Sequence, residues 1–248
     1  MLLERLSRPI RGVRVVRRDA LEPGDSATVH IIPMRQLDQR EVKRLLDRVD
    51  RRHERVVTSA LSKHEREVFL GLGFVERESL HLLRHDLSNI DQNIDAVTGV
   101  KLRPGRRTDL HQVLSIDRRS FDHFWALDRE SLNAARKATP THRYTIATAP
   151  NARGKSRVVG YAVTGRSGPS AFFQRLGVDP EQRRQGIGTA LVLDALHWAR
   201  DGGAKSMLVN TQDSNDRALS LYQHLGFDLV EDQLKVLELP GSLNSVSP

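Results

Sequence analysis

The 248-residue sequence contains no cysteine. Disulfide bonds, zinc sites with thiolate ligands and catalytic thiols are therefore excluded, and no metal site is predicted. No apolar run approaches the roughly 20 residues that a helix needs to cross a bilayer. Residues 1–9 also lack the continuous apolar core of a secretion signal. We therefore expect no membrane association and a cytoplasmic location.

The chain has a formal net charge of +8, from 39 Lys and Arg residues against 31 Asp and Glu residues. Such a surplus suits nucleic acid, an anionic lipid or an acidic ligand. Between residues 40 and 55, however, basic and acidic residues alternate, which is typical of a solvated helix face. We therefore disfavour nucleic acid as a partner, whereas a coenzyme with several phosphates would suit a basic rim.

A glycine-rich loop joins two regular segments in the second half of the chain. Residues 172–178 read as a strand and residues 189–200 as an apolar helix. Between them lies Arg183-Arg184-Gln185-Gly186-Ile187-Gly188. Glycines let the backbone approach a ligand closely, and the first N–H groups of a helix have no partner within it, so this order predicts an anion site suited to a pyrophosphate. The loop alone is weak support, because glycines also simply turn a chain.

A second block follows this loop. Residues 208–211 read as a strand, and residues 215–225 as a short amphipathic helix. Gly226-Phe227 then ends the helix and begins another strand. The apolar face of the helix carries Ala218, Leu221, Tyr222 and Leu225.

Together the two blocks resemble the fingerprint of the GCN5-related N-acetyltransferase (GNAT) superfamily, over residues 98–239. The matching residues are Val178, Pro180, Arg183, Gly186 and Gly188, then Asn215, Ala218, Tyr222, Gly226 and Phe227. The resemblance implies an α/β (α+β) fold with a mixed, twisted sheet of about seven strands flanked by helices. It also implies an enzyme that takes acetyl-CoA as co-substrate and acetylates a primary amine on a small molecule or a protein.

The resemblance assigns roles to particular residues. The cofactor-binding set would be Leu176, Gly177, Val178, Arg183, Arg184, Gln185, Gly186, Ile187, Gly188, Thr189, Asn215 and Tyr222. The Val178 N–H would polarise the thioester carbonyl. Tyr222 would be the general acid, because a phenol with a pKa near 10 can protonate a thiolate while staying neutral at pH 7. Two structural alternatives remain open: Tyr222 simply packs on the apolar face, and Asn215 simply caps its helix.

The general base is not predicted with the same clarity. In the branch of the superfamily that acetylates protein N-termini, a glutamate occupies the strand before the tyrosine helix, where this chain has Asn210. An amide cannot accept the proton. Asp122, His123 and His111 are the candidates, and a chain of water molecules is the alternative.

Three aromatic residues are candidates for substrate binding. Phe121, Phe124 and Trp125 either line the acceptor cleft or pack in the core.

The first ninety residues partly repeat the last ninety. Aligning Gly73 with Gly226 sets Phe69 beside Tyr222 and Ser62 beside Asn215 at one constant offset. The first copy has no glycine between residues 33 and 52, so it lacks a phosphate loop. We expect a degenerate partial GNAT-like domain at 1–90, a catalytic domain at 98–239 and a tail at 240–248.

The degenerate half would either be a packing partner or close one side of the acceptor cleft. Two further classes of function stay open for the whole chain. One is a catalytically weak sensor or scaffold that binds acyl-CoA, and the other is a basic nucleic-acid adaptor. A homodimer is compatible with the sequence.

Overall fold

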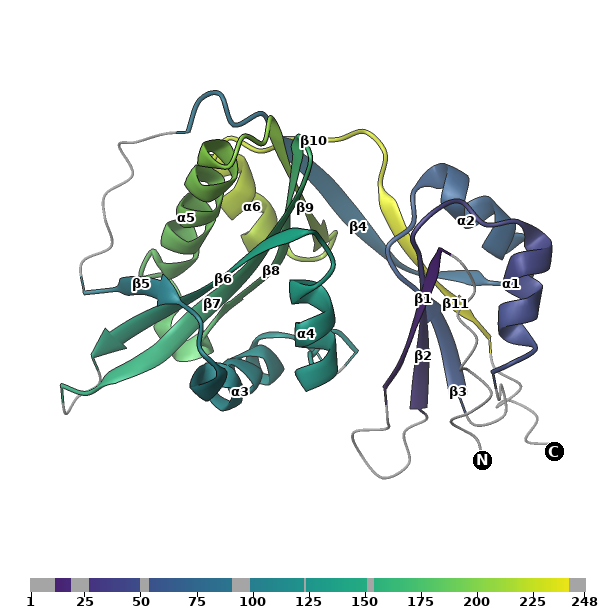
Figure 1. Ribbon diagram of the computed structural model, residues 1–248, viewed down its shortest axis with the longest axis horizontal. Coiled ribbons are helices and arrows are strands. Elements are labelled where there is room, and N and C mark those ends of the chain that lie inside the picture. Colours follow the sequence, from purple (N-terminus) through teal and green to yellow (C-terminus); the bar gives the residue numbers. More distant parts are fainter. Residues whose placement is uncertain are drawn as a thin grey trace. The chain divides into compact units, whose positions relative to one another are not determined.

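The computed structural model describes residues 12–18, 27–49, 54–90, 99–122, 124–150 and 154–240. The chain forms two compact units (Figure 1). Unit 1 combines residues up to His81 with residues from Glu231 onward, and unit 2 runs from Leu82 to Val230. These bounds differ from the expected 1–90 and 98–239.

Unit 2 is built on a mixed sheet. Its strands are β4 (Val75–His85, of which Leu82–His85 belong to this unit), β5 (Lys101–Pro104), β6 (Thr141–Pro150), β7 (Ser156–Ser167), β8 (Ser170–Val178), β9 (Ser206–Gln212) and β10 (Asp228–Leu229). The order is β4-β9-β8-β7-β6-β5, with β10 pairing to β4. Strands β8 and β9 are parallel, whereas β5 to β8 form an antiparallel series. The expected mixed α/β fold is confirmed.

Helices cover both faces of this sheet. They are η2 (Arg107–Asp109), α3 (Leu110–Ser120), α4 (Arg129–Arg136), η3 (Pro180–Gln182), α5 (Ile187–Asp201) and α6 (Asp216–His224). Neighbouring residues of β7 belong to different cores: Val159 packs with α5 and Val158 with α3. Because successive side chains of a strand point to opposite faces, α5 and α3 lie on opposite sides of the sheet.

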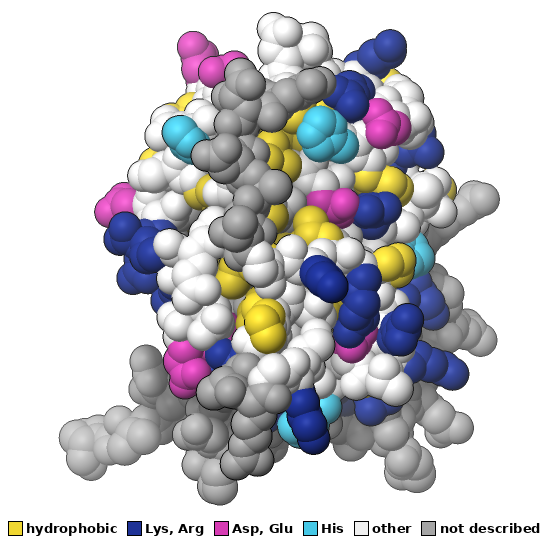
Figure 2. All heavy atoms as spheres, turned by 90° about the vertical axis from the view of Figure 1, so that its left-hand side faces the viewer, with side chains coloured by type: hydrophobic (Ala, Val, Ile, Leu, Met, Phe, Trp, Pro, Cys, Tyr) yellow, Lys and Arg dark blue, Asp and Glu magenta, His cyan; other side chains and the backbone are white. Residues whose placement is uncertain are grey.

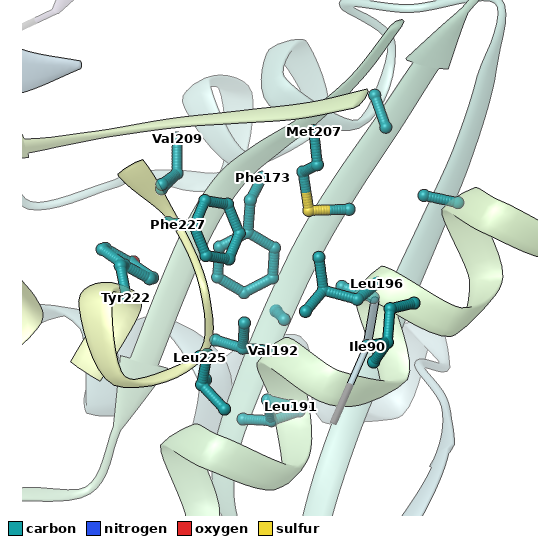
Figure 3. Close-up of a cluster of buried hydrophobic side chains, with 14 of the residues drawn as sticks. Ile90, Phe173, Leu191, Val192, Leu196, Met207, Val209, Tyr222, Leu225 and Phe227 are labelled. Carbon is teal, nitrogen blue, oxygen red and sulfur yellow. The ribbon is translucent and has the colours of Figure 1, made fainter. Parts of the chain in front are cut away.

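The larger core lies under α5 and α6 (Figure 3). Leu191, Val192 and Leu196 recur on α5 at helical spacing, which turns one continuous apolar stripe toward the sheet. Met207 of β9 and Phe227 complete the cluster, and all five side chains are buried. This core holds the helix that begins at the predicted phosphate loop.

Unit 1 has its own sheet and core. Its strands are β1 (Val13–Arg18), β2 (Ala27–Pro33), β3 (Glu54–Thr58), β11 (Leu234–Leu239) and the first part of β4, in that order. Helix α1 (Gln39–Leu46) begins at a capping box made by Asp38 and Glu41, and α2 (Lys63–Leu70) begins at Ser62. Helix α1 ends at Leu46.

Each unit takes a strand from the other half of the sequence. Strand β11, expected as the last strand of the catalytic domain, pairs with β3 and β4 in unit 1. Conversely, Leu83, Leu87 and Ile90, expected in or beside the degenerate domain, are buried in the core of unit 2. A strand pattern predicts that a strand exists but not which strand it pairs with, so the sequence could not place this exchange.

The surface has mixed charge. On the face shown in Figure 2, Lys and Arg side chains stand in groups with acidic side chains among them. Within the described ranges, no helix is long and apolar enough to cross a membrane.

Candidate active site

Strand β8 is paired on both sides for only part of its length. It pairs with β7 along Ser170 to Val178, but with β9 only from Ser170 to Phe173. Among the described residues, no strand therefore pairs with Leu176 to Val178 on the β9 side. An open edge of this kind offers backbone N–H and C=O groups to an extended ligand.

The register on the β7 side shows which backbone groups face the open edge. The amide of Asp179 donates to the Val159 carbonyl (2.9 Å), and Val178 is the next residue of the same ladder. Hydrogen-bonded and non-hydrogen-bonded pairs alternate in an antiparallel ladder. The N–H and C=O groups of Val178, and those of Leu176, therefore point away from β7. This direction is the one that the predicted contact between the Val178 N–H and a thioester carbonyl requires.

A β-bulge in β8 changes the face of the sheet to which the following side chains point. The register with β7 shifts between Phe173 and Arg175. Without the shift, both side chains would lie on one face, because the side-chain period of a strand is two. Instead Phe173 belongs to the core under α6, while Arg175 contacts Asp117 of α3. Bulges are frequent beside active sites because they re-aim side chains.

The loop after β8 contains two residues with positive φ. Arg184 (φ 64°) and Gly186 (φ 72°) both adopt the left-handed region, and α5 begins at Ile187, two residues before the predicted start at Thr189. Gly186 is the N-cap and, having no side chain, leaves the first amides of α5 without a capping group from this residue. The Ala190 amide donates to the Gly186 carbonyl (3.0 Å). Such turns align successive N–H groups into anion-binding concavities, and the helix dipole adds partial positive charge.

The side chains of this loop separate by burial. Ile187 is buried in the core, so only its backbone can serve a ligand. Arg184 and Gln185 are exposed, and Arg183 and Thr189 are half-buried. The two arginines are thus placed to bring positive charge to the helix start.

Gly177 of β8 and Gly188 of α5 are required for different structural reasons. A Cβ added at Gly177 would lie 2.4 Å from Cε1 of Tyr161, so this glycine makes room for a ring of the neighbouring strand. A Cβ added at Gly188 would lie 3.2 Å from Leu221 and 4.0 Å from Val178. Gly188 therefore lets the first turn of α5 approach both α6 and the end of β8.

Tyr222 lies on the inner face of α6 and is 4% exposed. Its ring centroid is 5.6 Å from that of Phe227 and 6.2 Å from that of Phe173 on β8 (Figure 3). Burial raises the pKa of Tyr222 well above its usual value near 10, and the positive charge of Arg175 acts in the opposite direction. The phenol is therefore neutral at pH 7, as a proton donor must be. The same contacts show that the ring also packs in the core.

Asn215 is the N-cap of α6. Its side-chain oxygen accepts a hydrogen bond from the Ala218 amide (3.2 Å). The capping interpretation is confirmed, and a further contact of Asn215 with the coenzyme stays a prediction.

The candidates for general base are dispersed. Asp122 is exposed and accepts from the Trp125 amide (3.1 Å), so it stabilises a local turn. His111 is exposed on α3, and His123 lies outside the described residues. Asn210 is exposed on β9.

The three aromatic candidates follow α3. Phe121 is its C-cap, and the rings of Phe124 and Trp125 lie 5.1 Å apart in an edge-to-face arrangement. All three side chains are half-buried, and none belongs to the buried core clusters of the described residues. They are thus available to line a surface next to β8.

Sequence reasoning missed a buried polar network on the α3 face of the sheet. Asp117 is 0% exposed and pairs with the Arg175 guanidinium through two hydrogen bonds (2.8 and 2.9 Å). The Tyr161 hydroxyl donates to the same carboxylate. Two features of the sequence pointed to this network. Asp117 occupies the next position of the apolar helix face that residues 110, 113 and 114 begin, and Arg175 interrupts an otherwise mostly apolar strand.

The end of α3 is also attached to the end of β8. Arg119 donates to both carboxylate oxygens of Asp179 (3.1 Å each), and the Ser120 hydroxyl donates to the Val178 carbonyl (3.0 Å). The Asp179 carboxylate is 2% exposed and also accepts from the Glu181 amide (3.2 Å). These contacts orient the backbone at Val178.

Residues 110–227 match the family model described as "Acetyltransferase (GNAT) family". The chain is 30% identical over 154 residues to a mycothiol acetyltransferase of Saccharomonospora viridis, covering 55% of this chain and 48% of that protein. It is 37% identical over 109 residues to the N-alpha-acetyltransferase RimI of Mycobacterium tuberculosis, covering 42% of this chain and 64% of that protein. The chain thus spans about half to two thirds of the length of these relatives.

The fold also has counterparts among solved structures. A tandem GNAT protein from the clavulanic acid biosynthesis pathway superposes with a TM-score of 0.62 at 15% identity, over 91% of this chain and 77% of that chain. At this identity the likeness concerns the fold. Residues 110–227, a little under half of the chain, are thus similar to the GNAT acetyltransferases, a family that uses acetyl-CoA as co-substrate.

Proposed function

We propose that this chain is an acetyl-CoA-dependent N-acetyltransferase that moves the acetyl group to a primary amine by direct attack. One observation carries the proposal. The open edge of β8 ends at an uncapped helix start, and Tyr222 is buried against Phe173 of the same strand. A backbone edge, an anion site and a neutral phenol are what a coenzyme thioester needs.

The coenzyme would lie along this edge. The pyrophosphate would be bound by the amides from Arg183 to Gly188, with the arginine side chains adding charge. The pantetheine arm would extend β8 through the Leu176 backbone groups and the Val178 N–H, since the Val178 carbonyl already accepts from Ser120. Gly177 contributes backbone only.

In the reaction, the amine nitrogen attacks the thioester carbonyl carbon. The Val178 N–H stabilises the negative charge that forms on the carbonyl oxygen. The carbon–sulfur bond then breaks, and the departing thiolate takes the Tyr222 hydroxyl proton. The amine loses its own proton to water, since Asn210 cannot accept it, and the tyrosine is reprotonated from solvent.

The acceptor is proposed as a primary amine on a small molecule or a protein. The names of the relatives support both classes, because one group is named for mycothiol and another for N-alpha acetylation. Phe121, Phe124 and Trp125 would form the acceptor wall, as half-buried aromatic side chains that follow α3.

We also propose that unit 1 is a degenerate copy of the fold in unit 2. In both units two parallel strands flank a helix: β2 and β3 with α1, and β8 and β9 with α5. The helix ends that follow agree in detail. The Phe74 amide donates to the Phe69 carbonyl (3.2 Å), as the Phe227 amide donates to that of Tyr222 (3.0 Å).

Further similarities at the same offset support this relationship. Gly73 (φ 87°) and Gly226 (φ 82°) both adopt the left-handed conformation that ends a helix. The Phe69 and Phe74 rings lie 5.2 Å apart, much as those of Tyr222 and Phe227 do at 5.6 Å. Phe69 has no hydroxyl and α1 starts without a glycine, so this copy would be catalytically silent.

Calorimetry with acetyl-CoA, followed by coenzyme A release with a panel of small amines and N-terminal peptides, tests the function. A sensor would bind the coenzyme tightly without turnover on any acceptor, and this outcome would contradict the proposed enzyme. Gly188→Trp should abolish binding, because it fills the space beside Val178 and Leu221.

A milder pair of variants isolates the anion site. Arg184→Glu puts a negative charge at the start of α5 and should weaken acetyl-CoA binding by about ten-fold. Arg200→Glu makes the same charge change at the other end of α5 and should leave the affinity within about two-fold. Equal effects of both variants would contradict the proposed pyrophosphate site.

A further inference from the structure

We propose that Arg175 is a positioning residue that holds Phe121 and residues 124–127 against β8, and so sets where the acceptor meets the thioester. The proposal rests on the proposed function for its consequence in catalysis. Its structural part stands on contacts of the described residues alone.

Arg175 connects three neighbours at one point. Its guanidinium forms the two-bond pair with Asp117, and its Nη2 also donates to the Trp125 carbonyl (2.8 Å). The carbon at its centre lies 3.5 Å from the Phe121 ring centroid. Only 12% of the side chain is exposed, so these contacts are little weakened by water. Phe121 and Trp125 are thus both attached to one side chain of β8.

Asp117 attaches the same segment from the helix side. Its Oδ1 accepts from the Leu127 amide as well as from Arg175, and its Oδ2 accepts from Tyr161. Leu127, Arg175 and Tyr161 are thus all donors to this fully buried carboxylate. Residues 124–127 lie between α3 and α4, and within the described ranges they belong to no helix or strand.

A buried ion pair contributes little net stability, because burial removes the hydration of both charges. An apolar pair of similar volume could fill the same space. What the planar guanidinium adds is geometry, since it can hold a carboxylate and a carbonyl in fixed directions at once. The bulge in β8 is what turns Arg175 toward α3, so the strand distortion and the ion pair serve the same arrangement.

The consequence concerns the acceptor. Arg175 and Val178 lie three positions apart on β8, so the contacts of Arg175 set the distance between the aromatic side chains and the Val178 N–H. Misplacing reacting groups by about 1 Å can cost two orders of magnitude in rate. Loosening Arg175 should therefore raise the KM for the amine and lower kcat, while leaving acetyl-CoA binding unchanged.

The test uses Arg175→Lys, which keeps the charge but cannot form the two-bond pair together with the carbonyl contact. The matched control is Arg143→Lys. Arg143 also forms a two-bond pair, with Asp194 (2.8 and 2.7 Å), but on the α5 face of the sheet. Both variants are made in a Trp198→Phe background, so that Trp125 is the one tryptophan left of the chain's two.

Acrylamide quenching of Trp125 fluorescence then reports the segment directly. Arg175→Lys should raise the quenching constant by about two-fold or more, and Arg143→Lys should leave it unchanged. Unchanged quenching in Arg175→Lys, or an equal rise in both variants, overturns the proposal. So does a raised quenching constant without any rise in the KM of the best amine of the panel.

Hydrogen exchange of the Leu127 amide in the unmodified protein covers the case that Arg175→Lys does not fold. We expect exchange slowed by about a hundred-fold relative to an unstructured peptide. Exchange at the peptide rate overturns the proposal without any variant. If the protein shows no turnover with any amine, the proposed function fails, while the quenching and exchange results still decide the positioning role.

Discussion

A Cβ atom placed on Gly177 of β8 would lie 2.4 Å from Cε1 of Tyr161, the residue that pairs with Gly177 on β7. Tyr161 is fully buried, and its hydroxyl donates to Asp117. Gly177 of β8 is therefore required by the Tyr161 ring, which leaves no room for a Cβ atom at this position.

Gly177→Ala should consequently destabilise the protein. Overpacking against a buried ring costs about 1–3 kcal/mol in the free energy of unfolding, measured by urea titration. Gly71→Ala is the control, because the nearest atom there is the end of the Gln39 side chain and its backbone is ordinary αR. An alanine at position 177 that costs no more than the control would show that Tyr161 moves freely.

Stability should fall as the solution is acidified through the range of His85. Its side chain is 2% exposed and accepts from the Leu87 amide through Nδ1 (2.9 Å). Burial lowers the pKa of His85, against the smaller opposing effect of Asp86. Above a pH of about 6.5 the residue is neutral in both states. Below it the unfolded chain binds a proton that the folded chain resists, so unfolding becomes easier.

Melting temperatures between pH 5 and 8 measure this effect. His85→Asn keeps an acceptor near the Nδ1 position but cannot titrate, so the dependence below pH ~6.5 should become flatter. His111→Asn, at an exposed position, should leave the dependence as it is. A profile that is equally steep in wild type and His85→Asn would assign the acid sensitivity to other groups.

Tyr222→Phe should retain acetyl-CoA binding and lower kcat by about a hundred-fold, which is the usual size of a lost general acid. Because burial raises the pKa of Tyr222, its ionisation should cause no loss of rate up to a pH of about 10 in the wild type. Coenzyme A release, followed with a thiol reagent across pH, provides the measurement. Full activity in the phenylalanine variant would leave Tyr222 with packing alone.

Fragments test the strand exchange. Residues 98–239 lack Leu83, Leu87 and Ile90 of the unit 2 core and carry β11, which pairs in unit 1. Burial of each such side chain contributes about 1.5–3 kcal/mol, so this fragment should aggregate. Residues 82–230 contain the complete core of unit 2 and should be more soluble and bind acetyl-CoA. Equal behaviour of the two fragments would contradict the unit boundaries.

Much of the site was predictable from local pattern. The glycine loop before α5 and the N-cap at Asn215 were predicted because helix starts need unpaired amides and capping side chains, which are properties of neighbouring residues. The role of Arg175 was not predictable. Strict alternation places it on the same face as Phe173, and the bulge that separates them depends on pairing with β7.

For the proposed tandem relationship, the sequence has a different limit. The constant offset between Phe69 and Tyr222 is visible in the sequence. Which strands complete each unit is not, because pairing joins residues far apart in the chain.

By itself, the sequence determined the family resemblance, the order of helices and strands, and the glycine-rich start of α5. Each of these follows from residue types within a few turns of one another. Only the tertiary structure decided the exchange of β4 and β11, the open edge at Val178 and the pairing of Arg175 with Asp117. These depend on register and on which faces meet, which are set by packing across the whole chain.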